Sequence, residues 1–373
     1  MHLHLLCEPV EASAYWVTDM VNGIVRESLK KGLDLITFTD GQVQEKQFSE
    51  THSSERQIAL VAGYSLGWID ETLRKLSGIQ VEPLLVSVYQ HTFRCEYSSV
   101  SFNTVKAMQT LIRTLSDAGK KSIAFFALHK DTVGDLAKLR GYTSGMRACG
   151  LNADTSNIYV RRKTMDCGAQ LLADIRRYDA IVCTNDLLAI WLIRYLQKHG
   201  IRIPEDVSVT GFGNWSSVDH FRPRLTRMYT DLEELGCQAV RLHQYMQYNP
   251  RIGHCASMLE CHLQASETAP ICSRLPADLP VKPYETSSLH YTADEDILSV
   301  LKLEDLVRNT DETDRLILSL LLRNETFFSV AEAVSVSEST VKYRLKRLLK
   351  ICGFRDRQEL LQLISAYHMF TKE

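Results

Sequence analysis

Short apolar runs alternate with stretches of helical periodicity along the first part of the chain. The runs LHLLC, LDLITFT, QIALVAG and PLLVSVY read as buried strands. Helical periods lie between them, near residues 16–31, in a polar stretch after residue 39, and near residues 69–76. This alternation of strand and helix predicts a parallel sheet with helices on both faces.

The alternation pauses at residues 92–101 and then begins again. Helices are predicted over residues 103–118, 136–149, 169–176 and 186–199, and they alternate with the runs SIAFFAL, NIYV, AIVCT and VSVTGFG. The pattern therefore predicts two α/β lobes in series. Such a pair of lobes serves either a two-domain enzyme or a hinged binding protein, and the fold alone does not decide between them.

A different pattern occupies residues 329–353, SVAEAVSVSESTVKYRLKRLLKICG. Ser337 is a good N-cap and Gly353 a natural C-terminal stop, so a helix of about four turns is predicted between them. Its apolar residues recur at helical spacing and form one stripe. They are Val341, Leu345, Leu348 and Cys352.

The opposite side of this helix is basic. Five Lys or Arg residues and one acid lie between residues 338 and 350, a net charge of +4 in a chain whose net charge is −2. This concentration of positive charge suits contacts with nucleic-acid phosphates. A short helix with Val330, Ala331 and Val334 precedes it, and Ser335 and Val336 form a tight turn, so the stretch is predicted to be a helix-turn-helix. A solvated basic helix is the plainer alternative.

Composition agrees with an ordinary globular protein. The 373 residues are 45% hydrophobic and 24% charged, and no apolar run is long enough to span a membrane. The N-terminal MHLHLLCEPV lacks a basic start and a cleavage site, so it is predicted to be a first strand of a cytoplasmic protein. The 10 cysteines include no CxxC pair and are expected to be reduced. His254, Cys255, Cys261 and His262 match no standard zinc spacing, and no metal, cofactor or catalytic site is predicted.

Three domains are predicted from these patterns. Residues 1–268 form the two-lobe domain, residues 269–308 a linker, and residues 309–373 the helix-turn-helix domain. Four of the nine prolines lie in residues 265–288. An acidic stretch follows at residues 294–314, where a solvated helix with capping acids is favoured over a mimic of DNA.

The C-terminal part resembles a known family. Residues 311–359, with DRLILSLL, SVAEAVSVSESTVKYRL and GFRDRQEL, look like the LuxR/GerE-type DNA-binding domain, and TVKYRLKRLLKICGF also resembles the PucR-type helix-turn-helix. Asn324 stands where the LuxR/GerE family usually has Gly, and Asn tolerates a left-handed conformation. The resemblance implies that Lys342, Tyr343 and Lys346 face bases and phosphates. The complete set of candidate DNA contacts is Ser339, Thr340, Lys342, Tyr343, Lys346, Arg347 and Lys350.

The two-lobe part resembles the effector domain of the LacI/GalR repressors, which has a type I periplasmic-binding-protein fold. The segment AIVCTNDLLAIWLIRYLQKHGIRIPEDVSVTGFGNW carries most of the likeness, and RPRLTRMYTDLEELGCQAV continues it as the crossover back to the first lobe. LacI-type repressors place their DNA-binding helices before this domain. In this sequence the predicted helix-turn-helix follows it instead.

Candidate ligand contacts come from loops after the strands, because ligands of open α/β sheets bind beyond the carboxyl ends of the strands. Trp16 and Tyr64 offer aromatic faces from the first lobe, and core packing is the alternative for both. Asn185, in CTND, matches the family's ligand-contacting Asn, while Asp186 is expected to cap the following helix.

Several positions depart from the family pattern. Lys138 stands where an Arg normally makes a forked contact, and Arg140 is its possible substitute. Phe102 and Gly213 each replace a carboxylate, and Asn214 lies beside Gly213. These changes weaken the case for a standard hexose as the ligand.

The sequence therefore predicts a ligand-responsive transcription regulator. It would bind double-stranded DNA as a homodimer, because two-fold symmetry matches a palindromic operator, and it would take a sugar or nucleoside-like effector. The alternative is a solute-binding protein whose C-terminal helices contact another protein. An enzyme is disfavoured, since no GxGxxG follows a strand and no P-loop or GxSxG is present.

Overall fold

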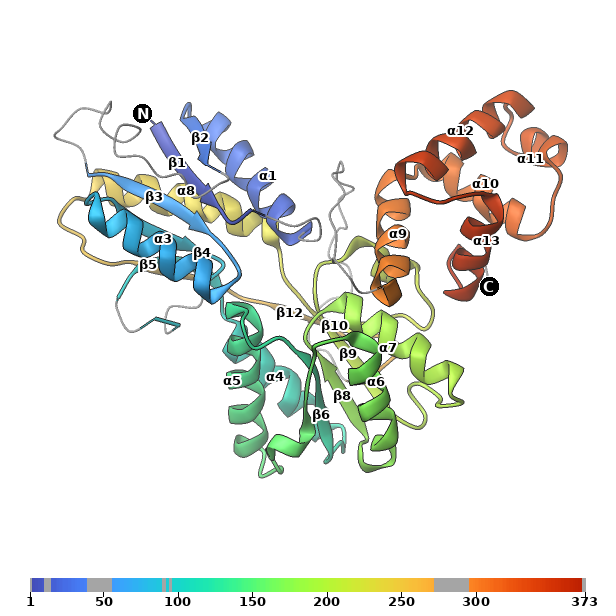
Figure 1. The fold of residues 1–373 in the computed structure, drawn as a ribbon, viewed down its shortest axis with the longest axis horizontal. Helices are drawn as coiled ribbons and strands as arrows, with labels where there is room; N and C mark the ends of the chain where they lie inside the picture. The colour runs from blue at the N-terminus through green and yellow to red at the C-terminus, as the bar shows by residue number, and fades with distance from the viewer. Residues whose placement is uncertain are drawn as a thin grey trace.

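The computed structural model describes residues 2–9, 15–38, 56–88, 92–93, 96–271 and 295–370. These residues form two lobes, each built on a six-stranded sheet, and a group of C-terminal helices that stands beside the second lobe (Figure 1). The polar helix predicted after residue 39 lies outside the described residues, as does the segment 272–294 of the linker region.

Lobe 1 has the strand order β11-β5-β4-β3-β1-β2, and all its strand pairs are parallel. Its strands are β1 (His2–Cys7), β2 (Asp34–Phe38), β3 (Ile58–Ala62), β4 (Glu82–Val86), β5 (Ser98–Phe102) and β11 (Ala256–Leu259). Its helices are α1 (Tyr15–Lys30), α3 (Leu66–Gly78) and α8 (Leu232–Tyr248). The helices flank the sheet as the alternating pattern predicts.

Lobe 2 has the strand order β12-β10-β9-β8-β6-β7, in which only β12 runs antiparallel to its neighbour. Its strands are β6 (Ile123–Leu128), β7 (Ile158–Val160), β8 (Ala180–Cys183), β9 (Ser208–Gly213), β10 (Thr226–Tyr229) and β12 (His262–Gln264). Its helices are α4 (Thr104–Asp117), α5 (Val133–Ala148), α6 (Thr164–Ala173) and α7 (Asp186–Lys198), with short turns η1 (Thr155–Asn157), η2 (Ile175–Arg177) and η3 (Ser216–His220).

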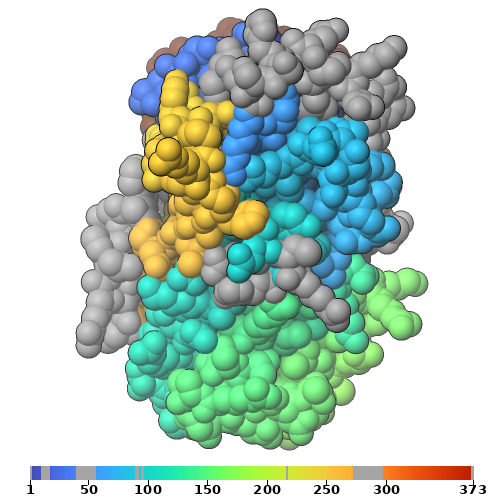
Figure 2. All heavy atoms as spheres, turned by 90° about the vertical axis from the view of Figure 1, so that its left-hand side faces the viewer, coloured from blue at the N-terminus to red at the C-terminus, as the bar shows by residue number. Residues whose placement is uncertain are grey.

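All eight strands predicted from apolar runs are confirmed, but β5, β10, β11 and β12 were not predicted. Strand β5 reads SSVSF, and its three serines hide the apolar signal even though every residue is buried. The chain passes from one lobe to the other after three of these four strands, β5, β10 and β11. The lobes are therefore interleaved along the chain rather than simply consecutive. In Figure 2 lobe 1 lies above lobe 2, with the crossover segments between them.

The C-terminal helices are α9 (Glu295–Asn309), α10 (Glu312–Leu322), α11 (Phe327–Ala333), α12 (Glu338–Ile351) and α13 (Arg357–Ala366). Residues 295–308, assigned to the linker from sequence, thus belong to a helix. Its apolar side chains, among them Ile297 and Leu303, are buried in the same hydrophobic cluster as Leu192 of lobe 2 and Leu345 of α12. The C-terminal helices consequently share one hydrophobic cluster with one side of lobe 2. The other side of lobe 2 has its own cluster, and the buried residues of lobe 1 form two more, one of which also contains Val133 of α5.

Candidate functional site

The α11–α12 connection has the geometry of a helix-turn-helix. Ser335 adopts a φ of 54°, and the Val336 N–H donates to the Ala331 carbonyl at 3.0 Å. The Ser337 hydroxyl accepts a hydrogen bond from the Thr340 N–H at 3.2 Å and so caps α12. The tight turn and the N-cap predicted from sequence are both confirmed.

The packed side of α12 is also as predicted. Val341, Leu345 and Leu348 are at most 5% exposed, and Cys352 just after the helix is 3% exposed. Gly353 takes a φ of 66°, a left-handed conformation that ends the helix. One face of α12 is therefore held against α9, α10 and α11 and cannot face a partner.

The opposite face of α12 is open to solvent. Tyr343 is 70% exposed and the Lys342 side chain 55% exposed. Ser339, Lys346 and Lys350 are exposed as well, whereas Thr340 is half-buried and its hydroxyl lies 2.9 Å from that of Ser337. The face thus presents a tyrosine and three lysines.

Lys342 is held in place by its neighbours. Its ammonium lies 2.8 Å from Glu338 and 5.4 Å from the centre of the Phe327 ring. Arg357 of α13 lies over the same ring at 5.0 Å. Phe327 thus orients two cations by cation–π contact at the edge of the open face.

Arg347, predicted from sequence as a DNA contact, is engaged inside the domain. Its guanidinium donates to Asp314 at 2.6 Å and to the Asn309 carbonyl at 3.2 Å. Arg344 also pairs with Asp314, at 3.0 Å, and with Asp311 at 2.8 Å. Two of the five cations counted in this helix are therefore compensated by acids of α10 and its cap.

Sequence reasoning missed the role of Asp314. Its side chain is completely buried, and with Asp311 it forms a capping box at the start of α10. The D-x-x-D spacing before the apolar run LILSLLL was the available signal. These acids of the 294–314 stretch bind arginines of α12 and so join α12 to α10.

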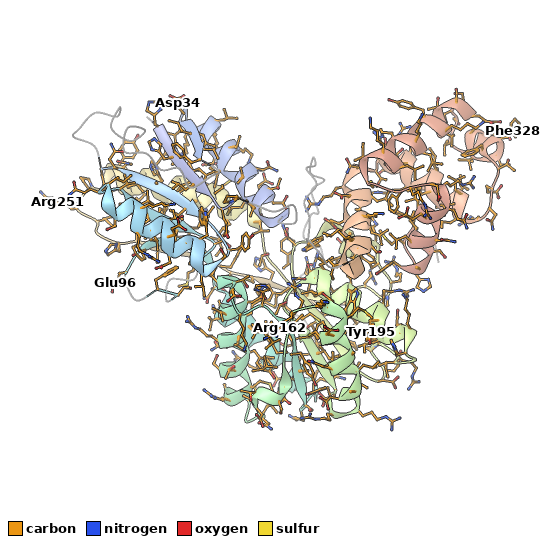
Figure 3. All side chains as sticks on the ribbon, in the orientation of Figure 1. Asp34, Glu96, Arg162, Tyr195, Arg251 and Phe328 are labelled. Carbon is orange, nitrogen blue, oxygen red and sulfur yellow. The ribbon has the colours of Figure 1, made fainter. Side chains whose placement is uncertain are left out.

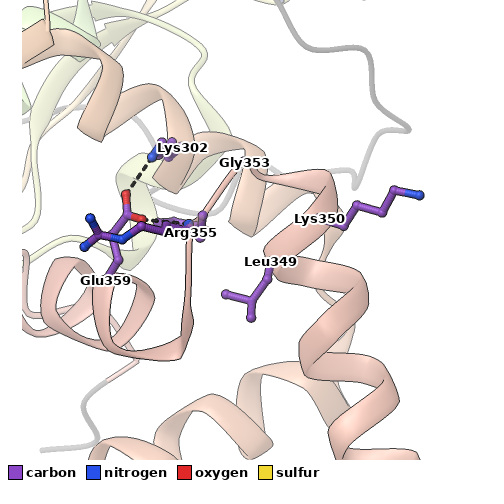
Figure 4. A pocket seen from close by; sticks show the side chains of 7 residues that line it. Lys302, Leu349, Lys350, Gly353, Arg355 and Glu359 are labelled. Atoms are coloured by element: carbon purple, nitrogen blue, oxygen red, sulfur yellow. Dashed lines mark hydrogen bonds and ion pairs between the residues drawn. The ribbon is translucent and has the colours of Figure 1, made fainter.

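A concave basic surface continues from the end of α12. A cavity of about 610 Å³ is lined by Lys302, Leu349, Lys350, Gly353, Phe354, Arg355 and Glu359 (Figure 4). Glu359 accepts from the Lys302 ammonium and from the Arg355 N–H, both at 2.7 Å. Lys350 points away from this pair in Figure 4, so its charge stays available beside them.

In lobe 2 the N-cap of α7 is Asn185 and not Asp186. Asn185 is the N-cap of α7, and its side chain accepts from the Leu188 N–H at 2.9 Å. Asp186 does not cap the helix. Its carboxylate is fully buried and pairs with Arg227 of β10 at 3.2 Å. The expectation that Asp186 caps α7 was wrong because a buried cation, unseen in the sequence pattern, binds it instead.

Arg227 and Asp186 form the centre of a buried polar network. The Arg227 guanidinium also donates to the Trp215 carbonyl at 2.9 Å and to Gln264 at 2.8 Å. Burial raises the pKa of the Asp186 carboxyl, and Arg227 opposes that shift. Gly211 makes room for the carboxylate, because a Cβ there would lie 2.4 Å from an Asp186 oxygen.

The other lobe 2 candidates lie in different surroundings. Lys138 pairs with Asp135 at 3.3 Å, and its ammonium lies 5.1 Å from the centre of the Phe212 ring at the end of β9. Arg140 is exposed on α5. Asn214 donates to Asp19 of lobe 1 at 3.3 Å, so its amide spans the two lobes.

The candidate ligand contacts of lobe 1 do not lie together either. Tyr64 follows β3, where its N–H donates to Glu8 at 2.6 Å and its carbonyl accepts from the Val133 N–H of lobe 2 at 3.0 Å. Phe102 is 6% exposed and packs in the lobe 1 core. Trp16 lies in the first turn of α1, but its side chain is outside the described part of the structure. Tyr64 and Asn214 therefore lie where the lobes meet, whereas Phe102 does not face a shared site.

Among the described residues, no helix is both long and apolar enough to cross a membrane. The eight cysteines in the same part of the chain are free thiols. Burial raises the pKa of the Cys7 thiol to about 12 and that of Cys167 to about 11. These thiols stay protonated at neutral pH and are poor nucleophiles.

Comparison with protein families identifies two parts of the chain. Residues 112–265 match a periplasmic binding protein-like domain, and residues 310–351 match a winged helix-turn-helix DNA-binding domain. The second match covers α10, α11 and α12. The chain thus combines a periplasmic-binding-protein-like domain with a helix-turn-helix.

Curated relatives are transcription regulators. The chain is 23% identical over 238 residues to the HTH-type transcriptional repressor PurR of Vibrio atlanticus, covering 62% of this chain and 71% of the relative. It is 25% identical to catabolite control protein A of Priestia megaterium, over 59% of each chain, and 24% identical to the repressor CytR of Escherichia coli, over 48% of this chain and 54% of the relative. The chain therefore spans between about half and about 70% of these relatives' lengths.

Solved structures show the same two-lobe fold. A complex of the transcriptional regulator CelR with cellobiose superposes with a TM-score of 0.59 at 18% identity, covering 72% of this chain and 84% of CelR. The regulator CcpA of Lactococcus lactis gives a TM-score of 0.59 at 17% identity, covering 72% of this chain and all of CcpA. The fold of the two lobes is thus LacI-like, with the C-terminal helices added to it.

Proposed function

We propose that this protein is a DNA-binding transcription regulator whose two-lobe domain takes a small-molecule effector. The open face of α12 is the observation that carries the proposal, because it presents Tyr343, Lys342, Lys346 and Lys350 beyond a buried apolar stripe. A helix of this kind enters the major groove, where lysines contact phosphates and side chains near the N-terminal half reach base edges. Two of the curated relatives, PurR and CytR, are named as HTH-type transcriptional repressors, which agrees with this function.

Within this proposal Lys346 and Lys350 are the strongest candidates for phosphate contacts. Arg347 is a weaker candidate than its sequence position suggests, because Asp314 holds its guanidinium. Ser339, Lys342 and Tyr343 lie in the N-terminal half of α12 and are assigned to base edges. Thr340 contributes mainly to the cap.

We further assign the C-terminal helices to the LuxR/GerE-like type. Four helices, α10 to α13, follow one another there, and within residues 310–370 the structure describes no strand that would form a wing. Asn324, at the position where that type usually has Gly, takes the left-handed φ of 62° that a Gly would adopt there. Both observations support the assignment.

The effector is proposed to be a sugar or nucleoside-like molecule held between the lobes. Support comes from CelR, which was solved as a complex with cellobiose. Tyr64 and Asn214, at the junction of the lobes, are the described candidates for contacting it. Asn185, which follows β8, and Lys138 of α5, whose ammonium lies beside Phe212 near the end of β9, are the other two. A homodimer in the cytoplasm completes the proposal, since one helix-turn-helix unit makes too few contacts for specific affinity.

The test is DNA binding by the full-length protein, with genomic fragments selected in vitro and measured at two salt concentrations. We expect a specific fragment whose affinity falls steeply with salt. The double variant Lys342→Ala/Lys346→Ala should bind it at least about tenfold more weakly and with a smaller salt dependence.

A matched control removes the same charge elsewhere. Arg74 and Lys75 are exposed cations of α3 in lobe 1, and the variant Arg74→Ala/Lys75→Ala should bind like the parent. Failure to select any fragment, or equal losses in the two double variants, would show that α12 does not serve as a DNA-recognition helix. The solute-binding alternative would then be preferred.

A further inference from the structure

The C-terminal helices pack against lobe 2, and the two form one packed body. His220 and Phe221 of the η3 region contact Phe370 and Tyr367, with ring centres 5.5 and 5.6 Å apart. Arg194 of α7 lies over the Tyr367 ring at 5.5 Å. Together with the shared hydrophobic cluster, these contacts fix the DNA-binding helices to lobe 2.

Lobe 1 meets this body through a buried polar contact at Asp19 of α1. The Arg308 guanidinium of α9 donates to the two Asp19 oxygens at 3.3 and 3.5 Å. The Asp19 and Arg308 side chains are each only 5% exposed. Breaking such a pair by removing one partner is costly, because the other charge remains buried.

Asp19 also contacts lobe 2. Asn214, which follows β9 at the carboxyl end of the lobe 2 sheet, donates to the same carboxylate at 3.3 Å. Glu304 of α9 accepts from the Ser217 N–H, three residues further along, at 2.7 Å. Lobe 1, the loop after β9 and α9 therefore converge on Asp19 and its neighbour Arg308.

The two acidic partners of Arg308, Glu304 and Asp19, belong to different parts of the molecule. Glu304 belongs to α9 itself and accepts from Arg308 at 2.7 Å, so this bond survives any movement of lobe 1. Asp19 belongs to the other lobe, and its bonds to Arg308 and Asn214 depend on how the lobes are arranged. A movement of one lobe against the other would therefore change the Asp19 contacts, whereas the bond between Arg308 and Glu304 does not depend on it.

The contact continues to the recognition helix. Asn309, the residue after Arg308, offers its carbonyl to Arg347 of α12 at 3.2 Å. Arg347 is in turn bonded to the buried Asp314 at 2.6 Å. The end of α9 is thus bonded to lobe 1 on one side and to α12 on the other.

We propose that Asp19 couples the arrangement of the two lobes to the recognition helix, through Arg308 and the C-terminal end of α9. The inference rests on the proposed function and states how an effector would control it. A ligand that binds one lobe arrangement better than another makes or breaks the Asp19 contacts, and its differential affinity sets the size of the response. The end of α9, which is also bonded to α12, then gains or loses its hydrogen bonds to lobe 1.

The experiment uses the full-length protein and three variants, Asp19→Asn, Arg308→Gln and the double variant. Hydrogen–deuterium exchange is measured over residues 17–23 of α1 and 304–309 of α9. Each single substitution should raise exchange in both segments, by roughly tenfold, although each lies in only one of them. The double variant should exchange no faster than either single one, because all three remove the same contact.

The control variant is Arg26→Gln, which removes an ion pair between α1 and Glu233 of α8. It should leave residues 304–309 unchanged. The coupling is refuted if Asp19→Asn and Arg308→Gln each raise exchange only in the helix that carries the substitution. It is also refuted if their effects on exchange multiply in the double variant. Arg308→Lys, which keeps the charge but not the forked geometry, replaces Arg308→Gln should that variant fail to fold, and the same pattern is required of it.

A second readout separates the coupling from the proposed function. On a fragment selected by the parent protein, Asp19→Asn and Arg308→Gln should change Kd in the same direction and by at least about fivefold, with Arg26→Gln unchanged. Unchanged affinity in the Asp19 and Arg308 variants would refute the link to α12. Should the parent select no fragment, the proposed function fails, while the exchange measurement still decides whether Asp19 couples the lobes to α9.

Discussion

At the scale of single residues, the charges that matter most in this protein are the buried ones. Asp19, Asp186, Glu304 and Asp314 are nearly or completely removed from solvent, and each is paired with an arginine. Such pairs depend on exact placement of both partners, because an unpaired buried charge is strongly unfavourable. They therefore fix the geometry of the parts they join more than they add to net stability.

Asp314 provides a test of this view in the C-terminal helices. Asp314→Asn keeps the shape of the side chain but removes the charge that Arg344 and Arg347 share. We expect the free energy of unfolding to fall by about 2 kcal/mol, because Arg347 loses its carboxylate partner and Arg344 keeps only Asp311. Urea unfolding followed by circular dichroism measures the change. A loss no larger than that of Asp70→Asn, at an exposed ion pair on α3, would contradict the expectation.

His243 makes the stability of lobe 1 depend on pH. It is fully buried in α8, and burial lowers its pKa from 6.5 to about 4, with a smaller contribution from nearby His4. The unfolded chain therefore binds one more proton than the folded chain between pH 6.5 and about 4. Stability due to this group is complete above pH 6.5 and falls by roughly 3 kcal/mol as the pH drops through that window.

The variant His243→Gln should remove this part of the pH dependence. Unfolding free energies measured from pH 4 to pH 7 should change less steeply with pH than those of the parent, since one proton uptake is lost. Identical slopes would mean that another group, with His4 the first to examine, causes the acid sensitivity.

At the scale of elements, close helix packing in lobe 1 depends on two glycines. Helices α1 and α8 cross at Gly23 and Gly236, where a Cβ would lie 2.0 Å from the Glu233 and Met20 carbonyl oxygens respectively. Neither backbone oxygen can yield without moving a helix. The crossing brings α1, which carries Asp19, into a fixed position on the lobe.

Gly236→Ala should therefore force the two helices apart. We expect a loss of about 1 to 3 kcal/mol in lobe 1, the usual cost of overpacking, and a lower thermal unfolding midpoint in calorimetry. Gly67→Ala in α3 is the control, since nothing lies within 4 Å of its added Cβ. The control should be neutral or slightly stabilising, because alanine favours a helix. Equal effects of the two substitutions would argue against the close crossing.

At the scale of the whole molecule, the hydrophobic clusters do not follow the boundaries of the domains predicted from the sequence. One side of lobe 2 shares a hydrophobic cluster with α9 and the other C-terminal helices, whereas the other side of lobe 2 and the buried residues of lobe 1 lie in other clusters. Phe328, 61% exposed, lies at the outer end of the C-terminal helices, far from either sheet (Figure 3). Lobe 2 and the C-terminal helices thus form one packed body that carries α12.

Leu306→Ala tests whether that body unfolds as a unit. Leu306 of α9 is fully buried in the shared cluster, and the substitution should cost about 2 to 5 kcal/mol. Hydrogen exchange should rise in α12 and in the β8 and β9 strands of lobe 2 together, and stay unchanged in lobe 1. Faster exchange in α12 alone would show that the C-terminal helices unfold independently.

Much of this protein follows from its sequence. The period of apolar residues determined eight strands and most helices, and cap, turn and glycine chemistry determined the helix-turn-helix from Ser337 to Gly353. These features are local, since each depends on residues within a few positions of one another. Strand β5 was not predicted, because neighbouring elements bury it although its own residues are rich in serine.

Only the tertiary structure decided which charges face solvent and which are paired. Arg347 and Arg227 look like ordinary cations in the sequence, yet Asp314 and Asp186, from other elements, bind them. The same holds for Asp19 and Arg308, which are 289 positions apart. Ion pairs of this kind carry no period along the chain, because their partners are brought together only when the lobes and the C-terminal helices pack. The sequence therefore determined the elements and the type of partner, and the packing determined how those elements are connected.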